Sequence, residues 1–552
     1  MIVSSEKLLQ AHPLELGGVA VIRGAPYRGA VDPIVATLVI LLCAVIAFVS
    51  NRIPLGVVAV GVSVALYLTG VLDLGSALAG FGDPTVLFIA SLFVVSEALE
   101  STGIIAWAGQ EVVAHSGTGR RRLLLTIGLL TAAMTAVISV NGSVASLLPL
   151  VVVVAARAGI RPSQMLMPLA FSAHAGSMLT LTGTPVNIIV SEVATDNGAR
   201  PFGFFEFALA GLPLLVGTLA IILLLGNRLL PERTPASAPI DLERLASLLR
   251  TDYALSPDRA LVSASRGVAE VVVPPRSSLI GLHVFPGMCT PSGDLVVLGV
   301  RRGQEALDES GTDLQAGDAL LLDGSWDDLQ RHTSQRDEVL VVDAPLTLRR
   351  SVPLGAGAKR TAVILLAMIV LLATGIVPAA IAGLLAAGAL ILTRVVSMPQ
   401  AYRAISWTTV ILVAGMIPLS TAFQETGAAQ LIADGLRSFL GDAGPHAAVA
   451  VIVLITLVLG QLISNTATVL IVAPVAVALA TAMEASMLPF LMALTIAGAA
   501  SFLTPVATPA NLMVMEPGGY RFGDYARFGW PLTVLFFVVA VFYVPLIWPF
   551  AG

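Results

Sequence analysis

The stretch Ile463–Thr468 reads Ile-Ser-Asn-Thr-Ala-Thr and lies in the middle of an uncharged run from Ala447 to Met483. Roughly 20 apolar residues cross a bilayer core, so this run is long for one crossing and short for two crossings joined by a turn. It therefore predicts a re-entrant hairpin with a polar tip at Ser464–Thr468. Non-helical backbone at membrane depth is tolerated where it is buried in protein or lines a wet cavity, which makes the tip a candidate ion or substrate site. The alternative is a polar patch that holds neighbouring helices together.

The composition is that of a polytopic membrane protein. Of the 552 residues, 56% are hydrophobic and 12% are charged, a balance that is far from that of a soluble domain. The two cysteines, Cys43 and Cys289, indicate neither a disulfide framework nor a metal cluster. The segment before Pro33 does not have the pattern of a signal peptide. No basic face with interleaved aromatic residues suggests nucleic-acid binding.

The pattern of the first half of the chain restarts after a polar central segment. Corresponding residues of the two halves are 324 positions apart (378 − 54, 465 − 141 and 511 − 187), as in the pairs Pro54 and Pro378, Asn141 and Asn465, and Asn187 and Asn511. A constant offset over more than a hundred residues indicates an internal duplication. Paired interruptions in the two halves of such a chain point to the binding site of a transporter.

The two copies are predicted to be inverted relative to each other. Each has five crossings, a broken helix and a re-entrant hairpin, the first hairpin lying within Leu123–Ala156. An odd number of crossings turns the second copy over. Basic clusters such as Arg120–Arg122 and Lys359–Arg360 then fall on one side, which the positive-inside rule assigns to the cytosol. The predicted fold is an all-α polytopic protein of the plasma (inner) membrane, with a small cytosolic α+β insert and both termini outside.

Four regions are expected along the chain. They are an N-terminal tail (residues 1–32), a first membrane repeat (33–233), the central segment with its linkers (234–358) and a second membrane repeat (359–552). In the central segment, short apolar runs such as Val271–Val273 and Leu295–Val300 alternate with turns, which predicts a β-rich domain with one or two short helices. Its tethers are predicted at Thr234–Pro239 and Ser351–Ala358.

Four polar interruptions are expected to meet near the middle of the membrane: Ser139–Ser143, Thr182–Asn187, Ser464–Thr468 and Thr504–Asn511. Helix N-termini favour anions, and free carbonyls with Ser, Thr and Asn oxygens suit Na⁺. These interruptions contain no Asp, Glu, Lys or Arg. Because proton transporters carry intramembrane carboxylates, proton exchange is disfavoured, and an anion held by helix ends, hydroxyls and Na⁺ fits better.

Three ionisable residues lie inside apolar runs. His174 is interpreted most simply as a neutral histidine bonded to a backbone carbonyl, and the alternative is a pH-sensing group beside the site. Glu97 and Glu100 lie toward the inner end of their helix and are expected to face the membrane interface.

Ser464-Asn465-Thr466, the paired segments Thr184–Asn187 and Thr508–Asn511, and the duplicated hairpin resemble the divalent anion/sodium symporter family of the ion transporter superfamily. The resemblance covers about Pro33–Arg233 and Thr361–Trp548. It implies two hairpin tips that hold a small anion with one Na⁺ beside each, a homodimer and an elevator movement. The implied substrate-binding residues are Asn141, Gly142, Ser143, Thr184, Ser464, Asn465, Thr466, Thr508 and Pro509. The implied Na⁺ ligands are Ser139, Asn141, Gly183, Asn187, Asn465, Ala507 and Asn511.

The first tip departs from the family pattern. Val140 and Gly142 stand where the family has Ser and Thr, so Ser139 or Ser143 would have to supply a hydroxyl. The insert, with Glu270–Pro275 and Leu314–Asp318, resembles the C-terminal (TrkA-C) domain of potassium-conductance regulators. That resemblance implies either a site for a small-molecule regulator or a dimerisation module.

The predicted function is Na⁺-coupled symport of a dicarboxylate or sulfate, with Na⁺ as coupling ion and no organic cofactor. The alternatives are an arsenite or other oxyanion permease and a ligand-gated K⁺ channel or sensor. The chain lacks a Thr-Val-Gly-Tyr-Gly filter, which argues against the channel. No pairing of a nucleophile with a base at membrane depth suggests an enzyme.

Overall fold

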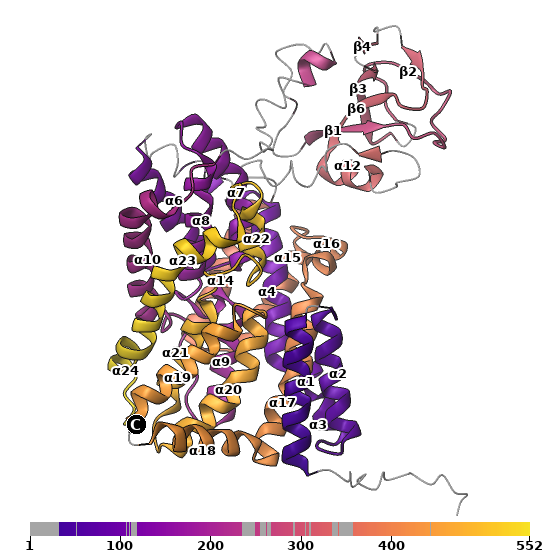
Figure 1. The fold of residues 1–552 in the computed structure, drawn as a ribbon. Helices are drawn as coiled ribbons and strands as arrows, with labels where there is room; N and C mark the ends of the chain where they lie inside the picture. Colours follow the sequence, from indigo (N-terminus) through magenta and orange to yellow (C-terminus); the bar gives the residue numbers. More distant parts are fainter. Residues whose placement is uncertain are drawn as a thin grey trace, which may run out of the picture.

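The computed structural model describes residues 32–50, 52–105, 107–109, 111, 119–233, 249–253, 261, 266–290, 293–303, 305–307, 311–333, 340–341, 357–441 and 443–551. The predicted N-terminal tail lies outside these ranges apart from residue 32, and so do the predicted tethers apart from residues 357 and 358. The described residues form a long helical body with a small strand-containing domain at one end (Figure 1).

The first half of the helical body contains α1 (Pro33–Ser50), α2 (Leu55–Leu68), α3 (Leu74–Leu78), α4 (Pro84–Ser101), α6 (Arg120–Thr135), α7 (Val140–Arg157), α8 (Leu166–Gly176), α9 (Pro185–Asp196) and α10 (Ala208–Leu229). The second half contains α14 (Ala358–Thr374), α15 (Ala379–Leu392), α16 (Met398–Ala404), α17 (Trp407–Thr426), α18 (Ala428–Leu440), α19 (Gly444–Leu459), α20 (Asn465–Ala482), α21 (Met487–Ala499), α22 (Pro509–Met515), α23 (Phe522–Val538) and α24 (Val544–Ile547).

The duplication is visible in the helix bounds. Both ends of α15 lie 324 residues after those of α2 (379 − 55 and 392 − 68), and both ends of α19 lie 324 residues after those of α6 (444 − 120 and 459 − 135). The α6–α7 hairpin lies at the end of the body nearest the insert, and the α19–α20 hairpin lies at the opposite end (Figure 1). The predicted fold of two inverted repeats, each with a hairpin and a broken helix, is therefore confirmed.

The broken helices stop and restart for a local reason. Pro185 and Pro509 occupy the first position of α9 and α22, where proline loses no helical hydrogen bond. The preceding threonines are N-caps: Thr184 Oγ1 accepts from Val186 N at 3.4 Å, and Thr508 Oγ1 accepts from Asn511 N at 3.4 Å. The chain between the half-helices, residues 177–184 and 500–508, is therefore not α-helical and contains only a short 3₁₀ turn at Leu181–Gly183.

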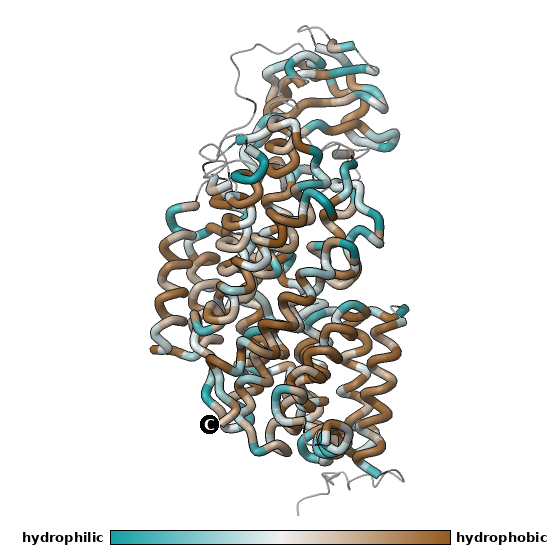
Figure 2. The backbone as a smooth tube through the Cα atoms, turned by 60° about the vertical axis from the view of Figure 1, so that its left-hand side comes forward, coloured by the Kyte–Doolittle hydropathy of each residue, from teal (hydrophilic) through white to brown (hydrophobic). Residues whose placement is uncertain are grey.

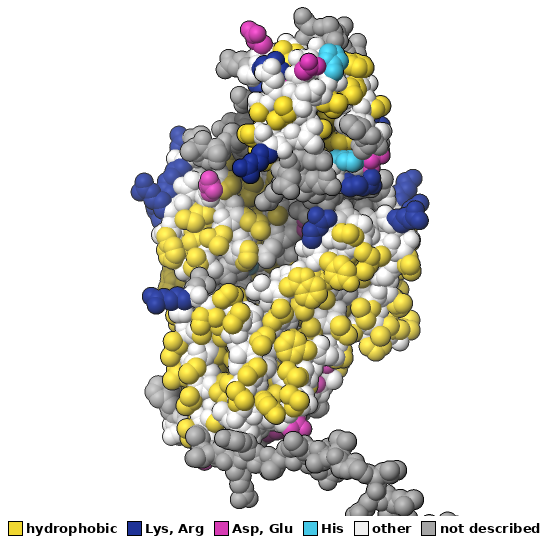
Figure 3. Space-filling model, turned by 90° about the vertical axis from the view of Figure 1, so that its right-hand side faces the viewer, with side chains coloured by type: hydrophobic (Ala, Val, Ile, Leu, Met, Phe, Trp, Pro, Cys, Tyr) yellow, Lys and Arg dark blue, Asp and Glu magenta, His cyan; other side chains and the backbone are white. Residues whose placement is uncertain are grey.

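The outside of the helical body is apolar. Among the described residues, six helices are long and apolar enough to span a membrane, and hydrophobic residues such as Leu224 and Leu392 are 75% and 84% exposed. In Figure 2 the helical body is mostly hydrophobic (brown), and hydrophilic residues (teal) become more frequent toward the insert. Hydrophobic side chains cover the flank, and Lys and Arg gather near the insert (Figure 3). The chain is a multi-pass membrane protein.

The insert is built on an antiparallel sheet in the order β4-β3-β6-β1-β7. Its elements are β1 (Arg266–Val272), β2 (His283–Val284), β3 (Leu295–Arg302), β4 (Glu305–Ala306), β5 (Thr312–Asp313), β6 (Ala319–Ser325), α12 (Trp326–Thr333) and β7 (Leu340–Val341). Of the predicted apolar runs, Leu295–Val300 falls on β3, and Val271–Val273 falls at the end of β1, with Val273 just beyond it. The strand-containing insert is thus confirmed.

Asp318 stabilises the turn before β6. Its carboxylate is 1% exposed and accepts hydrogen bonds from Arg302 Nε and Nη2 and from Gln315 N, all at 2.8 Å. Burial alone would raise the pKa of Asp318, but these donors outweigh burial and hold the pKa below its ordinary value of 3.8. The ion pair therefore stabilises the insert fully at neutral pH. This contribution is lost as the pH falls below about 3.8, where the unfolded chain takes up the proton first.

Replacing Asp318 by asparagine is expected to lower the free energy of unfolding of the insert by about 1–3 kcal/mol, because Arg302 and Gln315 N lose a charged partner. Hydrogen exchange of the β1 and β6 amides in the full chain measures this change. Asp323→Asn is the matched control: it removes a pair with Arg266, which is 54% exposed, and costs less than about 1 kcal/mol. Equal exchange rates in the two variants would contradict the assignment.

Candidate functional site

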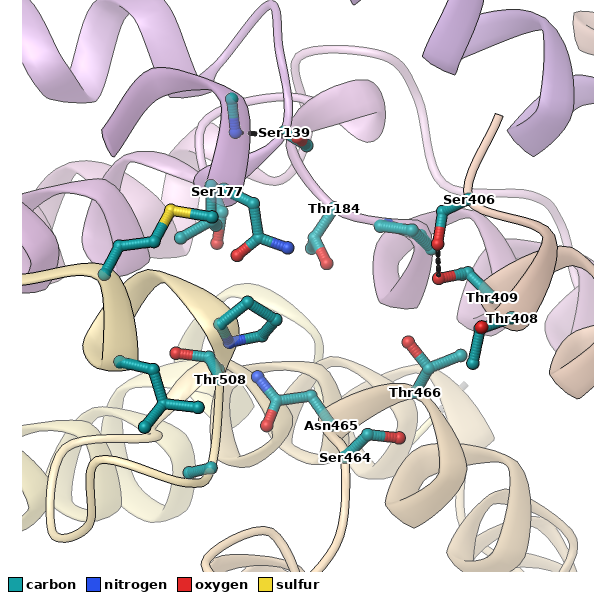
Figure 4. A pocket seen from close by; sticks show the side chains of 18 of the residues that line it. Ser139, Ser177, Thr184, Ser406, Thr408, Thr409, Ser464, Asn465, Thr466 and Thr508 are labelled. Carbon is teal, nitrogen blue, oxygen red and sulfur yellow. Dashed lines mark hydrogen bonds between the residues drawn. The ribbon is translucent and has the colours of Figure 1, made fainter. Parts of the chain in front are cut away.

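A cavity of about 1010 Å³ lies where the two hairpins and the two broken helices meet. Its volume is at the upper end of small-molecule sites, about 300–1,000 Å³. Figure 4 shows Thr184 from the first repeat and Asn465, Thr466 and Thr508 from the second around the same space. Ser406 and Thr409, from the start of α17, close one side and are hydrogen-bonded at 2.9 Å.

The cavity collects helix N-termini. The first residues of α7, α9 and α20 all line it, among them Asn141, Pro185 and Asn465. Each helix start carries unpaired N–H groups and about half a positive charge, so three of them aimed at one space favour an anion. The lining is otherwise rich in hydroxyls and contains Thr184, Thr466 and Thr508.

The second hairpin tip is braced from several sides. Ser464 Oγ accepts from Ala467 N at 3.3 Å and so caps α20, while Asn465 Oδ1 accepts from Ser501 Oγ at 2.5 Å. Gln461 donates to Ala500 O at 3.1 Å and accepts from Leu503 N at 3.0 Å. These bonds tie the tip to the break between α21 and α22. Sequence reasoning did not identify Gln461 as part of this bracing, although it stands three residues before the polar motif.

The first hairpin tip is bonded differently. Ser139 Oγ accepts from Gly142 N at 3.2 Å, and Asn141 Oδ1 accepts from Ala510 N of the other repeat at 3.1 Å. Asn141 and Asn465 are repeat partners, yet one oxygen binds a backbone amide and the other binds a serine hydroxyl. The two tips therefore offer different groups to a ligand.

Asn187 and Asn511 hold the two breaks together. Asn187 Nδ2 donates to Ser177 O and Thr180 O, at 2.9 and 2.8 Å. Asn511 Nδ2 donates to the corresponding carbonyls, Ser501 O and Thr504 O, at 2.7 and 3.1 Å. Both side chains are fully buried, so each supplies the hydrogen bonds that a continuous helix would have made.

The two asparagines differ at their oxygen atoms. His174 Nε2 lies 3.3 Å from Asn511 Oδ1 and 3.3 Å from Thr508 Oγ1. Because Nδ2 of Asn511 faces carbonyls, its Oδ1 accepts, and Nε2 of His174 carries a hydrogen. The sequence analysis expected His174 to bond to a backbone carbonyl, but the partners of its Nε2 are side-chain oxygens. Asn187 Oδ1, in contrast, is buried without a partner. The residue of the second repeat that corresponds to His174 is Gly498, which has no side chain to offer.

The structure brings together most of the predicted site residues. Those that line the cavity are Ser139, Asn141, Gly142, Gly183, Thr184, Ser464, Asn465, Thr466, Ala507, Thr508 and Pro509, with His174 beside them. Ser143, Asn187 and Asn511 are fully buried instead and are not among the lining residues.

Charged side chains also line the cavity, two of which the sequence analysis placed at the membrane interface. Glu97 and Glu100 of α4 line it, as does Arg403 of α16. The expectation that the two glutamates face the membrane interface is wrong, because α4 packs against α7, α9 and α16 and turns this face toward the cavity. Glu97 and Glu100 are three residues apart and so lie on one face of the helix. This spacing was the feature of the sequence that could have indicated a shared polar face.

A family model described as citrate transporter (CitMHS) matches residues 45–497 and 448–551 of this chain. The chain belongs to the citrate transporter family. Its relatives include proteins named sodium/sulfate cotransporter and solute carrier family 13 member 2. This agrees with the resemblance to divalent anion/sodium symporters. The resemblance of the insert to a TrkA-C domain stays a prediction.

Three proteins that are similar to this member of the citrate transporter family differ in how much of the chain they match. Uncharacterized transporter YfbS of Escherichia coli (strain K12) is 29% identical over 606 residues, which cover 93% of this chain and 98% of YfbS. Sodium/sulfate cotransporter 1 of Chlamydomonas reinhardtii is 30% identical over 246 residues, 42% of this chain and 26% of that protein. The crystal structure of the Alcanivorax borkumensis YdaH transporter aligns with 95% of this chain and 100% of that chain, at 13% identity and a TM-score of 0.49. The family and the named relatives are transporters, not enzymes.

Proposed function

We propose that this transporter carries a small divalent anion, a dicarboxylate or sulfate, by symport with Na⁺. The observation that carries the proposal is the convergence of three helix N-termini and several hydroxyls on one cavity between the hairpins. Such a lining compensates negative charge without a fixed basic residue on either tip, so the anion can be released again. The names of the relatives, sodium/sulfate cotransporters among them, point the same way.

The proposed Na⁺ site lies at the second tip. Asn465 Oδ1 and the backbone at Ala507 belong to the two chain breaks that face each other there, and both residues line the cavity. Hard oxygen ligands from broken helices are the usual environment of a coupling Na⁺. The proposal is restricted to this half, because Val140 and Gly142 of the first tip stand where the family pattern has Ser and Thr.

The proposed movement is that of an elevator within a homodimer, as the family resemblance implies. In support of a moving unit, α7 packs against α8 and α22, and α9 packs against α20 and α21, so the hairpins and broken helices of both repeats form one block. The protein is proposed to lie in the plasma (inner) membrane with the insert in the cytosol, since basic residues gather at the insert's end of the body (Figure 3). It would there hold a small-molecule regulator.

Uptake into proteoliposomes tests the proposal. Sulfate, succinate, citrate and aspartate are offered with an inward Na⁺ gradient, and with choline in place of Na⁺. We expect at least one divalent anion to accumulate more than tenfold faster with Na⁺. Uptake of none of these anions, or uptake indifferent to Na⁺, would contradict the proposed function.

A further inference from the structure

Two carboxylates of α4 lie at the wall of the cavity, on the side of the first hairpin tip. Glu97 and Glu100 both line the cavity and are half-buried. A Cβ atom built on Gly142 would lie 2.6 Å from Glu100 Oε1, which places this carboxylate directly against the backbone of the tip. The neighbouring Asn141, in the first turn of α7, also lines the cavity. A helix start that favours anions and a carboxylate therefore stand side by side.

The charges around the cavity do not suit a ligand that carries negative charge alone. Among the described residues that line it, Glu97 and Glu100 are acidic, and Arg403 of α16, which is exposed, is basic. His174 also lines the cavity, and its Nε2 faces side-chain oxygens of the second repeat. Carboxylates repel an anion, and the low dielectric of a cavity walled by protein strengthens the repulsion. The acidic side chains of α4 therefore oppose a purely anionic ligand at the first tip.

A cationic group on the ligand turns this repulsion into attraction. In an α-amino dicarboxylate such as L-aspartate, an ammonium group stands on the carbon next to one of the carboxylates. The first tip offers the matching pair of groups, a helix N-terminus for a carboxylate and Glu100 for the ammonium beside it. An ionised carboxylate accepts up to about four hydrogen bonds, so Glu100 can accept from an ammonium as well as from groups of the protein. The cavity of about 1010 Å³ has room for such a ligand.

We propose that the cavity selects dicarboxylates that bear an ammonium group, and that Glu100 accepts the hydrogen bonds of this group. Glu97, one turn earlier on α4, adds negative charge beside it. The inference rests on the proposed anion transport and narrows its substrate class: helix N-termini and hydroxyls hold the carboxylates of the substrate, and α4 holds its ammonium. Aspartate is then a better ligand than succinate or sulfate, which lack the cationic group.

L-Aspartate and L-malate are the pair of ligands that tests the inference, because a hydroxyl replaces the ammonium group in a molecule of nearly the same shape. Both are titrated calorimetrically into the purified full chain at neutral pH and saturating Na⁺. Hydrogen bonds to charged groups change an affinity by roughly 10- to 150-fold, and we expect the wild type to bind aspartate more tightly than malate by about this factor. Equal or tighter binding of malate would overturn the inference and leave the proposed transport of a dicarboxylate standing.

Three variants identify the group that recognises the ammonium. Glu100→Gln keeps the shape of the side chain and removes its charge, so the preference for aspartate should disappear, while malate binds as well as before or better because the repulsion is lost. Gly142→Ala places a methyl group 2.6 Å from Glu100 Oε1, so the carboxylate must move away from the tip, and the preference should fall without a change of charge. Glu425→Gln is the control: Glu425 is exposed near the end of α17, is not among the cavity-lining residues, and should keep the preference.

The ratio of the two affinities separates recognition of the ammonium from structural damage, because a damaged site binds both ligands more weakly. An undiminished preference for aspartate in Glu100→Gln would overturn the inference. If Glu100→Gln does not fold, the same criterion applies to Gly142→Ala. If aspartate, malate, succinate, citrate and sulfate all fail to bind the wild type, the proposed function itself is contradicted, and the inference falls with it.

Discussion

Asn465→Ala is expected to weaken anion and Na⁺ binding together, each by roughly 5- to 150-fold, which corresponds to about 1–3 kcal/mol. The side chain stands at the N-terminus of α20, lines the cavity, and receives the hydroxyl of Ser501 at 2.5 Å. Its loss removes a proposed Na⁺ ligand and the bond between the tip and the α21–α22 break. Because Na⁺ and the anion would share one site, their binding is coupled: linkage requires each ligand to raise the affinity of the other by the same factor, so a loss at the Na⁺ site also weakens anion binding.

The matched control is the repeat partner. Asn141→Ala removes a bond to Ala510 N instead of a proposed Na⁺ ligand, so we expect it to reduce anion affinity with little change in the Na⁺ concentration that gives half-saturation. Calorimetric titration of the anion at several Na⁺ concentrations measures both quantities. Unchanged affinity and unchanged Na⁺ dependence in Asn465→Ala would exclude the second tip as the Na⁺ site.

The sequence predicted those parts of the fold that repeat themselves. The offset between Asn141 and Asn465 located both hairpins, and Thr-Pro followed by Asn at Thr184 and Thr508 located both broken helices. Inversion followed from the odd number of crossings, which the structure confirms. Duplication makes such predictions strong, because two independent segments must satisfy one pattern.

The atoms that each residue uses could not be predicted in the same way. The spacing places Asn187 and Asn511 at the breaks, but only the backbone path decides that their Nδ2 atoms face carbonyls. Likewise, Glu100 and Gly142 are far apart in the chain, and the contact between them depends on how α4 packs against the hairpin. Departures from the repeat, such as Gly142 for Thr466 and His174 for Gly498, were visible in the sequence. The residues that contact Gly142 and His174 lie in other helices or in the opposite repeat.

Asn187→Ala is expected to destabilise the helical body by about 2–6 kcal/mol, because two buried carbonyls lose their donor at about 1–3 kcal/mol each. Asn511→Ala should have a similar effect, since its Nδ2 serves the corresponding carbonyls Ser501 O and Thr504 O. Thermal unfolding in detergent, followed by size-exclusion chromatography, ranks the variants. Asn197→Ala is the control at the end of α9: its Nδ2 donates to Val193 O at 2.8 Å in a partly exposed position, and its loss should cost less than about 1 kcal/mol.

Asn187→Asp separates this structural role from the Na⁺ ligation that the family resemblance implies. Aspartate keeps the Oδ1 oxygen but replaces the Nδ2 donor by a second oxygen, so it cannot donate to Ser177 O and Thr180 O, and a structural brace is lost at every Na⁺ concentration. A Na⁺ ligand would behave differently: the unpartnered Oδ1 of Asn187 would bind the ion in the wild type, and the aspartate would bind it at least as well. If Asn187 is a structural brace, Asn187→Asp should lower the unfolding temperature, and added Na⁺ should not restore it. Full restoration by Na⁺ in Asn187→Asp, with none in Asn187→Ala, would instead make the buried oxygen of Asn187 a coupling-ion ligand.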